Sequence, residues 1–462
     1  MIDEESIQQL KASMRGAIMQ PGDSGFEEAR KVYNAMIDKH PRLIAKCEDV
    51  ADVIYTVNFA RDNDLLLAVR GGGHNGGGLG ICDDGVVLDL SHLNGVQVNP
   101  EKKTVRVEGG CTWGKVDHAT HAFGLATPSG IISTTGVGGL TLGGGIGHLT
   151  RAYGLSIDNL LEADVVLADG SLVKASETEH EDLFWAIRGG GGNFGVVTSF
   201  LFKLHPVDMD YAGPMLWELN QVKEVMQWWR DFILEAPEDL NGFFAFVQVP
   251  PGEPFPAEHH NKLVGGVIWC YTGDPEKVEE VFGPIRSMQP QPIIDLVGPL
   301  PHPVLQSMFD PLYPPGHQWY WRADFVNEIS DEAIDRHLEF AQKLPSPQSS
   351  MHLYPINGAA HELDKDATAW SFRDANWSQV IIGVDPDPAN KEKITNWTKA
   401  YFDALHPYSA GGAYVNFMME EGDERIRATY RDNYARLAHI KYKYDPNNLF
   451  KVNQNIKPAV LA

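Results

Sequence analysis

A histidine that directly follows three glycines has the clearest potential for chemistry in this chain. The segment consists of Arg70, Gly71, Gly72, Gly73, His74 and Asn75. Glycines leave the backbone N–H groups accessible, so successive groups can bind an anion such as a pyrophosphate without basic side chains. A neutral imidazole can act as a nucleophile. The segment therefore indicates either an anion-binding loop with a reactive histidine or a tight turn without a ligand.

Two further glycine clusters lie downstream, at residues 136–147 and 189–195. No cluster combines the GxGxxG pattern with a following long helix in a βαβ unit, and GxxxxGK[ST] occurs nowhere in the chain. The first pattern marks Rossmann dinucleotide sites and the second marks P-loops. The sequence therefore argues against both of these nucleotide folds.

Polar side chains alternate in two β-like stretches of the second half of the chain. His352 and Tyr354 lie two residues apart, before a turn that contains Asn357. Side chains two residues apart in a strand point to the same face, so we expect these two side chains together. Tyr320 and Arg322 have the same spacing. Each pair could line a substrate pocket or pack in a core.

The chain has 462 residues and a formal net charge of −24. This length favours two domains, and the acidity argues against nucleic acid and anionic membranes as partners. The first residues are acidic and no apolar stretch approaches about 18 residues, so we expect no secretory signal, no membrane span and a cytoplasmic protein. The four cysteines are far apart and are expected to be reduced thiols. We expect no metal site.

The periodicity of apolar residues predicts helices and strands in alternation. The expected strands include residues 65–69, 86–90, 104–107, 263–271 and 319–325. The expected helices include residues 222–234, 331–344 and a segment around 426–437. Another helix is expected to begin at a capping box at residues 178–181 and to end at Gly189. These elements indicate an α+β protein.

Taken together, the glycine clusters and their neighbours resemble the FAD-linked oxidases of the vanillyl-alcohol oxidase superfamily, specifically the berberine-bridge-enzyme-like branch. The matching segments are residues 70–75, 136–147, 153–159, 183–189, 192–197 and 443–447. The resemblance implies a PCMH-type FAD-binding domain at residues 1–206, with its core at about 38–206, completed by residues 411–462. Residues 207–410 would form a substrate domain, in which helices cover an antiparallel sheet.

The resemblance implies that FAD is covalently bound. In this family the histidine of the glycine run bonds to the 8α-methyl group of the flavin, and His74 is the matching residue. Many relatives add a second bond from a cysteine, but the aligned position here holds Ile132, and no cysteine lies within twenty residues of it. We therefore expect a single covalent bond, as in members that resemble 6-hydroxy-D-nicotine oxidase.

Further cofactor neighbours follow from the resemblance. Thr135 matches a position proposed to control the access of oxygen to the flavin. Valine occurs there in oxidases, and threonine has nearly the same shape, which favours O2 as the electron acceptor. The full set of expected FAD neighbours is Arg70, Gly71, Gly72, Gly73, His74, Asn75, Thr135, Gly136, Gly138, Gly139, Asp158, Gly195, Val197, Asn453 and Asn455.

The reaction that the resemblance implies is hydride transfer from a CH–OH or CH–NH group of a small substrate to flavin N5, while a protein base takes a proton. Tyr414 matches the tyrosine of a Tyr-x-Asn element, which is a proposed base in relatives, and His352 and Tyr354 are rival bases. Tyr320, Arg322 and Asn357 are expected in the substrate pocket. The alternatives are a flavin dehydrogenase with another acceptor and a non-catalytic flavin-binding protein.

Overall fold

The strands before residue 207 form two small sheets and a two-stranded ribbon, in a computed structural model that describes residues 4–460. The first sheet has the order β1 (Ala17–Met19), β2 (Leu43–Lys46), β4 (Val86–Asp89) and β3 (Leu67–Arg70), with β2, β4 and β3 parallel. The second is antiparallel, in the order β5 (Val96–Asn99), β6 (Thr104–Glu108), β10 (Val196–Lys203), β8 (Leu160–Val166) and β9 (Leu172–Ser176). The ribbon pairs β7 (Leu125–Ala126) with β11 (His205–Pro206).

Short helices connect these strands. They are α1 (Glu4–Ser13), α2 (Phe26–Ala29), α3 (Val50–Asp62), α4 (Trp113–His121), α5 (Val137–Gly143), α6 (Thr150–Tyr153) and α7 (Glu181–Ile187). The predicted capping box before α7 is wrong. His180 occupies the N-cap with φ +46° and no side-chain cap, while the N–H of Thr178 donates to Ser176 Oγ in a local turn.

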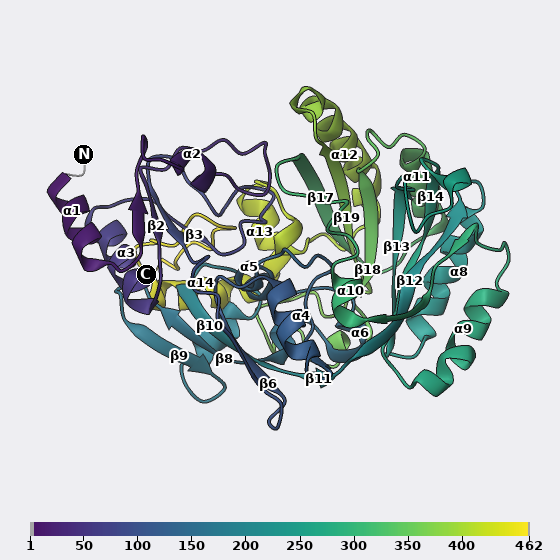
Figure 1. The fold of residues 1–462 in the computed structure, drawn as a ribbon, viewed down its shortest axis with the longest axis horizontal. Helices are drawn as coiled ribbons and strands as arrows, with labels where there is room; N and C mark the ends of the chain where they lie inside the picture. Colours follow the sequence, from purple (N-terminus) through teal and green to yellow (C-terminus); the bar gives the residue numbers. More distant parts are fainter. Residues whose placement is uncertain (1–3, 461–462) are drawn as a thin grey trace.

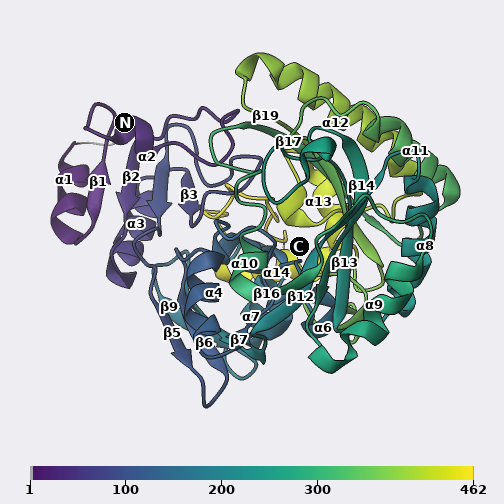
Figure 2. The same ribbon diagram turned by 45° about the vertical axis from the view of Figure 1, so that its right-hand side comes forward.

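One large antiparallel sheet follows. Its strands have the order β15 (Ile294–Asp295), β12 (Met209–Glu218), β14 (Leu263–Tyr271), β13 (Leu240–Gln248), β18 (Ser350–Pro355), β19 (Trp377–Asp385) and β17 (Gln318–Val326), and β16 (Gly298–Pro301) also pairs with β12. The helices α8 (Val222–Glu235), α9 (Val278–Ser287), α11 (Asp331–Ala341) and α12 (Lys391–Leu405) lie along its outer side (Figures 1 and 2). The other face points toward the small sheets, and α10 (His302–Gln306) packs against α4. The α+β prediction is confirmed.

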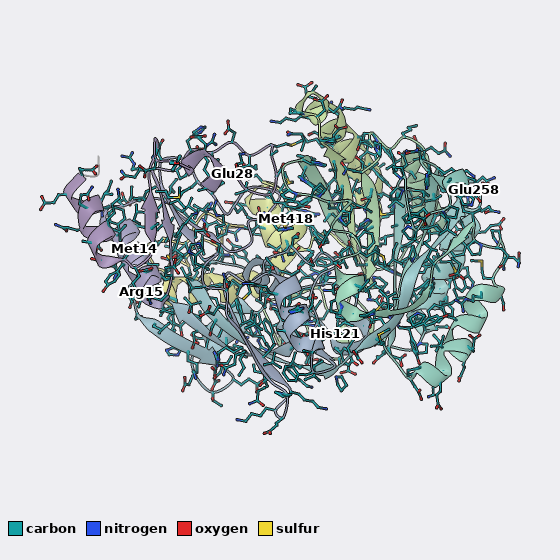
Figure 3. The ribbon with its side chains drawn as sticks, in the orientation of Figure 1. Met14, Arg15, Glu28, His121, Glu258 and Met418 are labelled. Atoms are coloured by element: carbon teal, nitrogen blue, oxygen red, sulfur yellow. The ribbon has the colours of Figure 1, made fainter. Side chains whose placement is uncertain are left out.

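The C-terminal segment returns to the centre of the molecule (Figure 1). The single helix expected around residues 426–437 is wrong, because the chain forms α13 (Asp423–Tyr430) and α14 (Asn433–Tyr444), separated at Arg431, where φ is +46°. Met418, just before α13, lies near the middle of the molecule, whereas Met14 and Glu258 lie toward opposite ends (Figure 3). No helix among residues 4–460 is long and apolar enough to cross a membrane.

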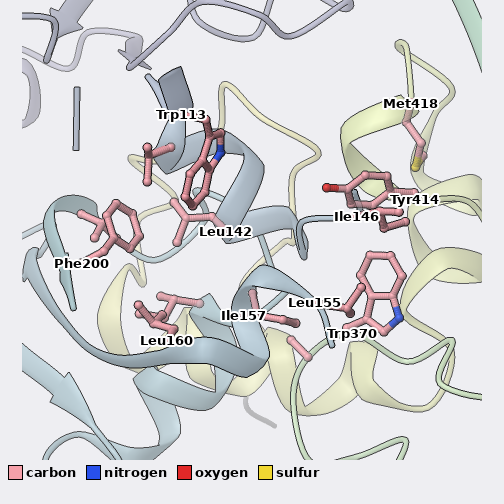
Figure 4. Packing of buried hydrophobic residues seen from close by; sticks show 14 of the residues in the cluster. Trp113, Leu142, Ile146, Leu155, Ile157, Leu160, Phe200, Trp370, Tyr414 and Met418 are labelled. Carbon is pink, nitrogen blue, oxygen red and sulfur yellow. The ribbon is translucent and has the colours of Figure 1, made fainter. Parts of the chain in front are cut away.

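One hydrophobic cluster joins the small sheets to the large one. It contains Trp113 and Phe200 from the N-terminal part, Tyr354 from the large sheet, and Trp370 and Tyr414 from the later chain. Figure 4 shows Leu142 and Ile157 between Trp113 and Trp370, with Tyr414 beside Met418. Burial of apolar surface therefore holds the two sheet systems together around the segments that carry the glycine clusters.

A buried ion pair fixes the C-terminal segment. Lys441 Nζ donates to Asp445 Oδ2 at 2.6 Å, to Asn193 O at 2.7 Å and to Phe450 O at 2.9 Å. Both partners are fully buried. All three ammonium protons therefore have acceptors, and the pair ties residues 445–450 to the third glycine cluster.

We expect Lys441→Ala to lower the free energy of unfolding by about 3–5 kcal/mol, because it leaves the Asp445 carboxylate buried without a counter-charge. Urea denaturation followed by tryptophan fluorescence would measure this loss. Lys443→Ala is the matched control, since Lys443 lies on the same helix but is exposed and pairs with Asp182. Its cost should stay below about 1 kcal/mol, and equal losses in the two variants would contradict the assignment.

Candidate active site

A cavity lies between the small sheets, the large sheet and the C-terminal segment. Its volume is about 320 Å³. The N-terminal side is lined by residues of all three glycine clusters, and the opposite side by residues of β17, β18 and β19. The cavity thus gathers chemistry-bearing segments that are far apart in the sequence.

Two of the glycine clusters touch through their backbones at the wall of the cavity. A Cβ atom placed on Gly72 would lie 2.5 Å from Gly136 N, and one placed on Gly136 would lie 2.4 Å from Gly72 N. Gly73 also has φ +69°, which glycine adopts without strain. Packing between the two loops therefore requires these glycines. Part of the glycine content of the two clusters is thus explained without any ligand.

The residues present also fit a bound dinucleotide. Gly139 and Gly192 line the cavity, and a Cβ atom on either would meet nothing within 4 Å, so both leave open cavity space. The N–H groups of residues 72–75 donate to no acceptor among the described residues. Arg70 Nη1 and Asn453 Oδ1 are buried at the same cavity without a partner. The free N–H groups and Arg70 Nη1 are donors that suit an anionic group such as a pyrophosphate, whereas Asn453 Oδ1 can accept a hydrogen bond from a ligand.

His74 lies at the cavity with its ring held on three sides. The ring stacks on Tyr33 with 4.1 Å between centroids, Thr134 Oγ1 lies 3.0 Å from Nε2, and Thr135 Oγ1 lies 3.5 Å from Nδ1. Burial lowers the pKa of His74 to about 4, so the imidazole is neutral at pH 7. A neutral, oriented imidazole has the lone pair that a nucleophile needs.

Two further positions named from the sequence lie at the same cavity as His74. Thr135 and Ile132 both line the cavity. None of the four cysteines, which all lie within the described residues and are buried, lines it. His74 is therefore the only side chain of the expected covalent pair that carries a nucleophile.

Tyr414 also borders the cavity. Its hydroxyl oxygen accepts hydrogen bonds from Gly145 N at 2.9 Å and from Asn416 Nδ2 at 2.7 Å. These two donors favour the phenolate, but burial outweighs them and raises the pKa of Tyr414 to about 12. The hydroxyl therefore keeps its proton at pH 7 and can donate it to a ligand.

His352 and Tyr354 form a hydrogen-bonded pair on β18, with 2.7 Å between His352 Nδ1 and Tyr354 Oη. Both line the cavity, and Tyr313 Oη lies 3.5 Å from His352 Nε2 and 3.0 Å from Ser350 Oγ. Burial lowers the pKa of His352 to about 3 and raises that of Tyr354. The pair therefore offers a neutral imidazole that can accept a proton through a phenol.

Two expected FAD neighbours lie away from the cavity. Asp158 forms a buried ion pair with Arg373, with oxygen–nitrogen distances of 2.6 and 2.7 Å, and accepts from Leu155 N. Asn455 follows Gln454, the last residue of this segment to line the cavity. Assigning Asp158 to the cofactor is therefore wrong, whereas the role of Asn455, whose buried Oδ1 has no partner among the described residues, stays a prediction. The other expected neighbours all line the cavity: Arg70, Gly71, Gly72, Gly73, His74, Asn75, Thr135, Gly136, Gly138, Gly139, Gly195, Val197 and Asn453.

The three residues expected in the substrate pocket lie elsewhere, so this expectation is wrong. Tyr320 and Arg322 point to the outer face of β17, where Lys399 Nζ lies 5.5 Å from the Tyr320 ring centroid and Arg322 pairs with Glu421 at 2.5 Å. Asn357 accepts from Arg151 Nε at 3.0 Å and borders a separate surface groove. In β17 the alternate residues face the cavity instead.

Sequence reasoning missed several side chains that line the cavity: Tyr33, Tyr313, Trp319, Trp321 and Gln454. Trp319 and Trp321 were detectable as the other alternating set of β17, but both sets contain aromatic residues. A Cβ atom on Gly76 would lie 2.3 Å from the Trp321 ring, so that glycine makes room for the indole. Tyr33 precedes every motif, and no pattern marked it.

Comparisons with known proteins agree with this site. A model of the FAD binding domain matches residues 41–176, and the berberine and berberine-like model matches residues 413–457. An FAD-linked oxidoreductase of Dictyostelium discoideum is 33% identical over 98% of this chain and 97% of its own length. The (R)-6-hydroxynicotine oxidase of Paenarthrobacter nicotinovorans is 28% identical over 96% of this chain and 97% of its own.

The crystal structure of 6-hydroxy-D-nicotine oxidase from Arthrobacter nicotinovorans has a TM-score of 0.85 and 26% identity to this chain, and covers 97% of this chain and 99% of that one. Similarity of this kind extends through the small sheets, the large sheet and the C-terminal segment. The chain belongs to the berberine-bridge-enzyme-like family of FAD-linked oxidoreductases and is an FAD-dependent oxidoreductase.

Proposed function

We propose that the protein is an oxidase that carries FAD on a single covalent bond to His74 and oxidises a CH–OH or CH–NH group of a small substrate, with O2 as the electron acceptor. The observation that carries the proposal is one cavity with two unlike sides. Bare glycine backbone and His74 border one side, and the His352–Tyr354 pair borders the other. A cytoplasmic location stays a prediction.

Each part of the chain has a distinct role in this proposal. Residues 1–206 and 411–462 hold FAD through the free N–H groups of residues 72–75 and through His74, while residues 207–410 provide the substrate side. Bound FAD supplies a two-electron acceptor for the hydride of the substrate. The protein supplies position, a dry environment and a proton acceptor.

The His352–Tyr354 pair is our preferred proton acceptor. In the tautomer of neutral His352 whose Nδ1 carries no proton, Tyr354 donates to Nδ1 across 2.7 Å. Its oxygen can then accept the substrate O–H or N–H proton as its own proton moves to the imidazole. Tyr414 is the second candidate, because it borders the same cavity, but its hydroxyl accepts from Gly145 N and Asn416 Nδ2 and has no histidine beside it to take its proton. A non-catalytic flavin-binding protein would be favoured if all three side chains were remote from the flavin ring, and their position at the cavity supports an enzyme instead.

Replacement of His74 tests the covalent bond. We expect His74→Ala to lose all covalent flavin, because Ile132 offers no second nucleophile. The measurement is flavin fluorescence of the protein band after denaturing electrophoresis. His118→Ala, at an exposed histidine of α4, is the control and should keep its fluorescence. Covalent flavin in the His74→Ala variant would rule the assignment out.

Substitutions of His352 and Tyr354 test which group accepts the proton. We expect Tyr354→Phe and His352→Gln each to slow anaerobic flavin reduction by substrate about 10²–10⁴-fold, the usual range for a lost general base. Tyr320→Phe, on the outer face of the same sheet, should leave the rate unchanged. If Tyr414→Phe abolishes reduction while Tyr354→Phe does not, the base is Tyr414.

The pH dependence of the same rate gives a separate check. The pKa of His352 is about 3, so the imidazole is already neutral in mild acid. The rate of flavin reduction should therefore stay constant from about pH 5 to about pH 8. It should fall only in stronger acid, as protonation removes the acceptor. A decline with a midpoint near the ordinary histidine value would show that the acceptor is not buried as described.

Reoxidation separates an oxidase from a dehydrogenase. We expect substrate-reduced enzyme to regain its yellow colour within seconds of mixing with aerated buffer, followed by absorbance in a stopped-flow instrument. The bulkier Thr135→Leu should slow this step, since Thr135 borders the cavity beside His74. Enzyme that stays colourless for minutes in air, yet reoxidises with an artificial acceptor, is a dehydrogenase.

A further inference from the structure

One flat face of the His74 imidazole is covered by the ring of Tyr33. The two rings stack with 4.1 Å between centroids and 21° between planes. Each ring nitrogen lies near a threonine hydroxyl, with Thr134 Oγ1 3.0 Å from Nε2 and Thr135 Oγ1 3.5 Å from Nδ1. The lone pair of a neutral imidazole lies in the plane of the ring. Tyr33 therefore covers a face of the ring and leaves the nucleophilic electron pair uncovered.

A histidine side chain does not by itself fix the direction of its ring. The torsion between Cβ and Cγ joins a tetrahedral carbon to a planar one and has broad energy minima. Formation of a covalent bond needs reacting atoms about 3–3.5 Å apart with aligned orbitals, and a misplacement of about 1 Å can slow a reaction about 100-fold. A flat partner that restricts the rotation of His74 therefore affects how fast its imidazole can bond to a ligand.

Tyr33 is itself held at three points. Its Oη donates to Tyr313 O at 2.6 Å, and its N–H donates to Gly73 O at 3.1 Å. Its ring also lies 4.9 Å from the Trp319 ring between centroids. Burial raises the pKa of Tyr33, so the hydroxyl keeps its proton and remains a donor. The ring is therefore fixed both to the glycine loop that carries His74 and to the opposite side of the cavity.

Asn34 fixes the same segment to the large sheet. Among the described residues, β17 is the last strand at its end of that sheet. Asn34 is fully buried, and its amide pairs with the main chain of Trp319 in both directions: Nδ2 donates to Trp319 O at 3.0 Å and Oδ1 accepts from Trp319 N at 3.1 Å. Nδ2 also donates to Gly76 O at 2.7 Å, and Oδ1 accepts from Met36 N at 3.0 Å. All four hydrogen-bonding positions of the amide are thus used.

We propose that Tyr33 is the positioning residue for the covalent bond between His74 and FAD. Its ring fixes the plane of the imidazole so that a ring nitrogen reaches the 8α carbon of the flavin, and Asn34 keeps Tyr33 in place. The inference rests on the covalent bond proposed above. When that bond forms, the 8α carbon and the imidazole each lose a proton, and the nitrogen lone pair becomes the C–N bond. The electron pair of the broken C–H bond stays on the flavin with two protons, and O2 then takes both electrons and both protons as hydrogen peroxide.

The rate of covalent bond formation tests this role. Full-length protein from riboflavin-limited cells is mixed with excess FAD, and covalent flavin is followed over time as fluorescence of the protein band after denaturing electrophoresis. Division by the total flavin that stays with the protein on gel filtration removes any loss of FAD affinity. We expect Tyr33→Leu and Tyr33→Met to form the bond at least about tenfold more slowly than wild type. Tyr33→Phe, which retains the ring, should keep the wild-type rate.

Phe325→Leu is the matched control. Phe325 is a buried aromatic residue that stacks on Phe372 with 4.3 Å between centroids and 20° between planes, and it does not line the cavity. Its replacement removes a similar stacked ring and should leave the rate of bond formation unchanged. An equal delay in Phe325→Leu would show that general destabilisation explains the effect. An equal delay in Tyr33→Phe would show that the hydroxyl group matters rather than the ring, and either result overturns the inference.

The covalent bond and its positioning fail in different ways. If wild-type protein forms no covalent flavin, the bond to His74 is wrong and the inference falls with it. If wild type forms the bond and Tyr33→Leu and Tyr33→Met form it equally fast, only the inference is overturned. Methionine is unbranched and adapts to irregular space, so Tyr33→Met decides the question if Tyr33→Leu does not fold.

Discussion

The loops at residues 71–73 and 136–139 touch where no side chain fits. A Cβ atom on Gly72 or Gly136 would lie within 2.5 Å of the opposite backbone. This approach sets the wall of the cavity, leaves the N–H groups of residues 72–75 unused and brings His74 beside Thr134 and Thr135. The cofactor-binding side therefore depends on a backbone-to-backbone contact rather than on charged side chains.

That arrangement explains how a chain with a net charge of −24 can suit an anionic cofactor. Three buried basic side chains are paired with carboxylates within the protein. Arg70 is held by Asp89, Arg373 by Asp158 and Lys441 by Asp445. Oriented backbone N–H groups supply the positive end of a dipole without a full charge to desolvate. Among the described residues that line the cavity, the only charged side chain, Arg70, is thus neutralised by Asp89.

The large sheet provides the second side by the alternation of its strands. On β17, Trp319 and Trp321 face the cavity, while Tyr320 and Arg322 face α12 and the C-terminal segment. On β18, His352 and Tyr354 face the cavity. Since a one-residue change of register exchanges the two faces, the face that the helices cover decides which residues meet the ligand.

The sequence by itself determined the family, the α+β class, the three glycine clusters and the neighbourhood of His74, because these rest on local motifs with a fixed order. It also placed His352 and Tyr354 on one face, since a strand alternates. The tertiary structure alone decided which face of β17 is inside, that Asp158 is paired with Arg373, and that Tyr33 stacks on His74. The physical reason is that burial depends on partners far along the chain, because the polar face of β17 is also covered, by α12 and by Glu421, which pairs with Arg322.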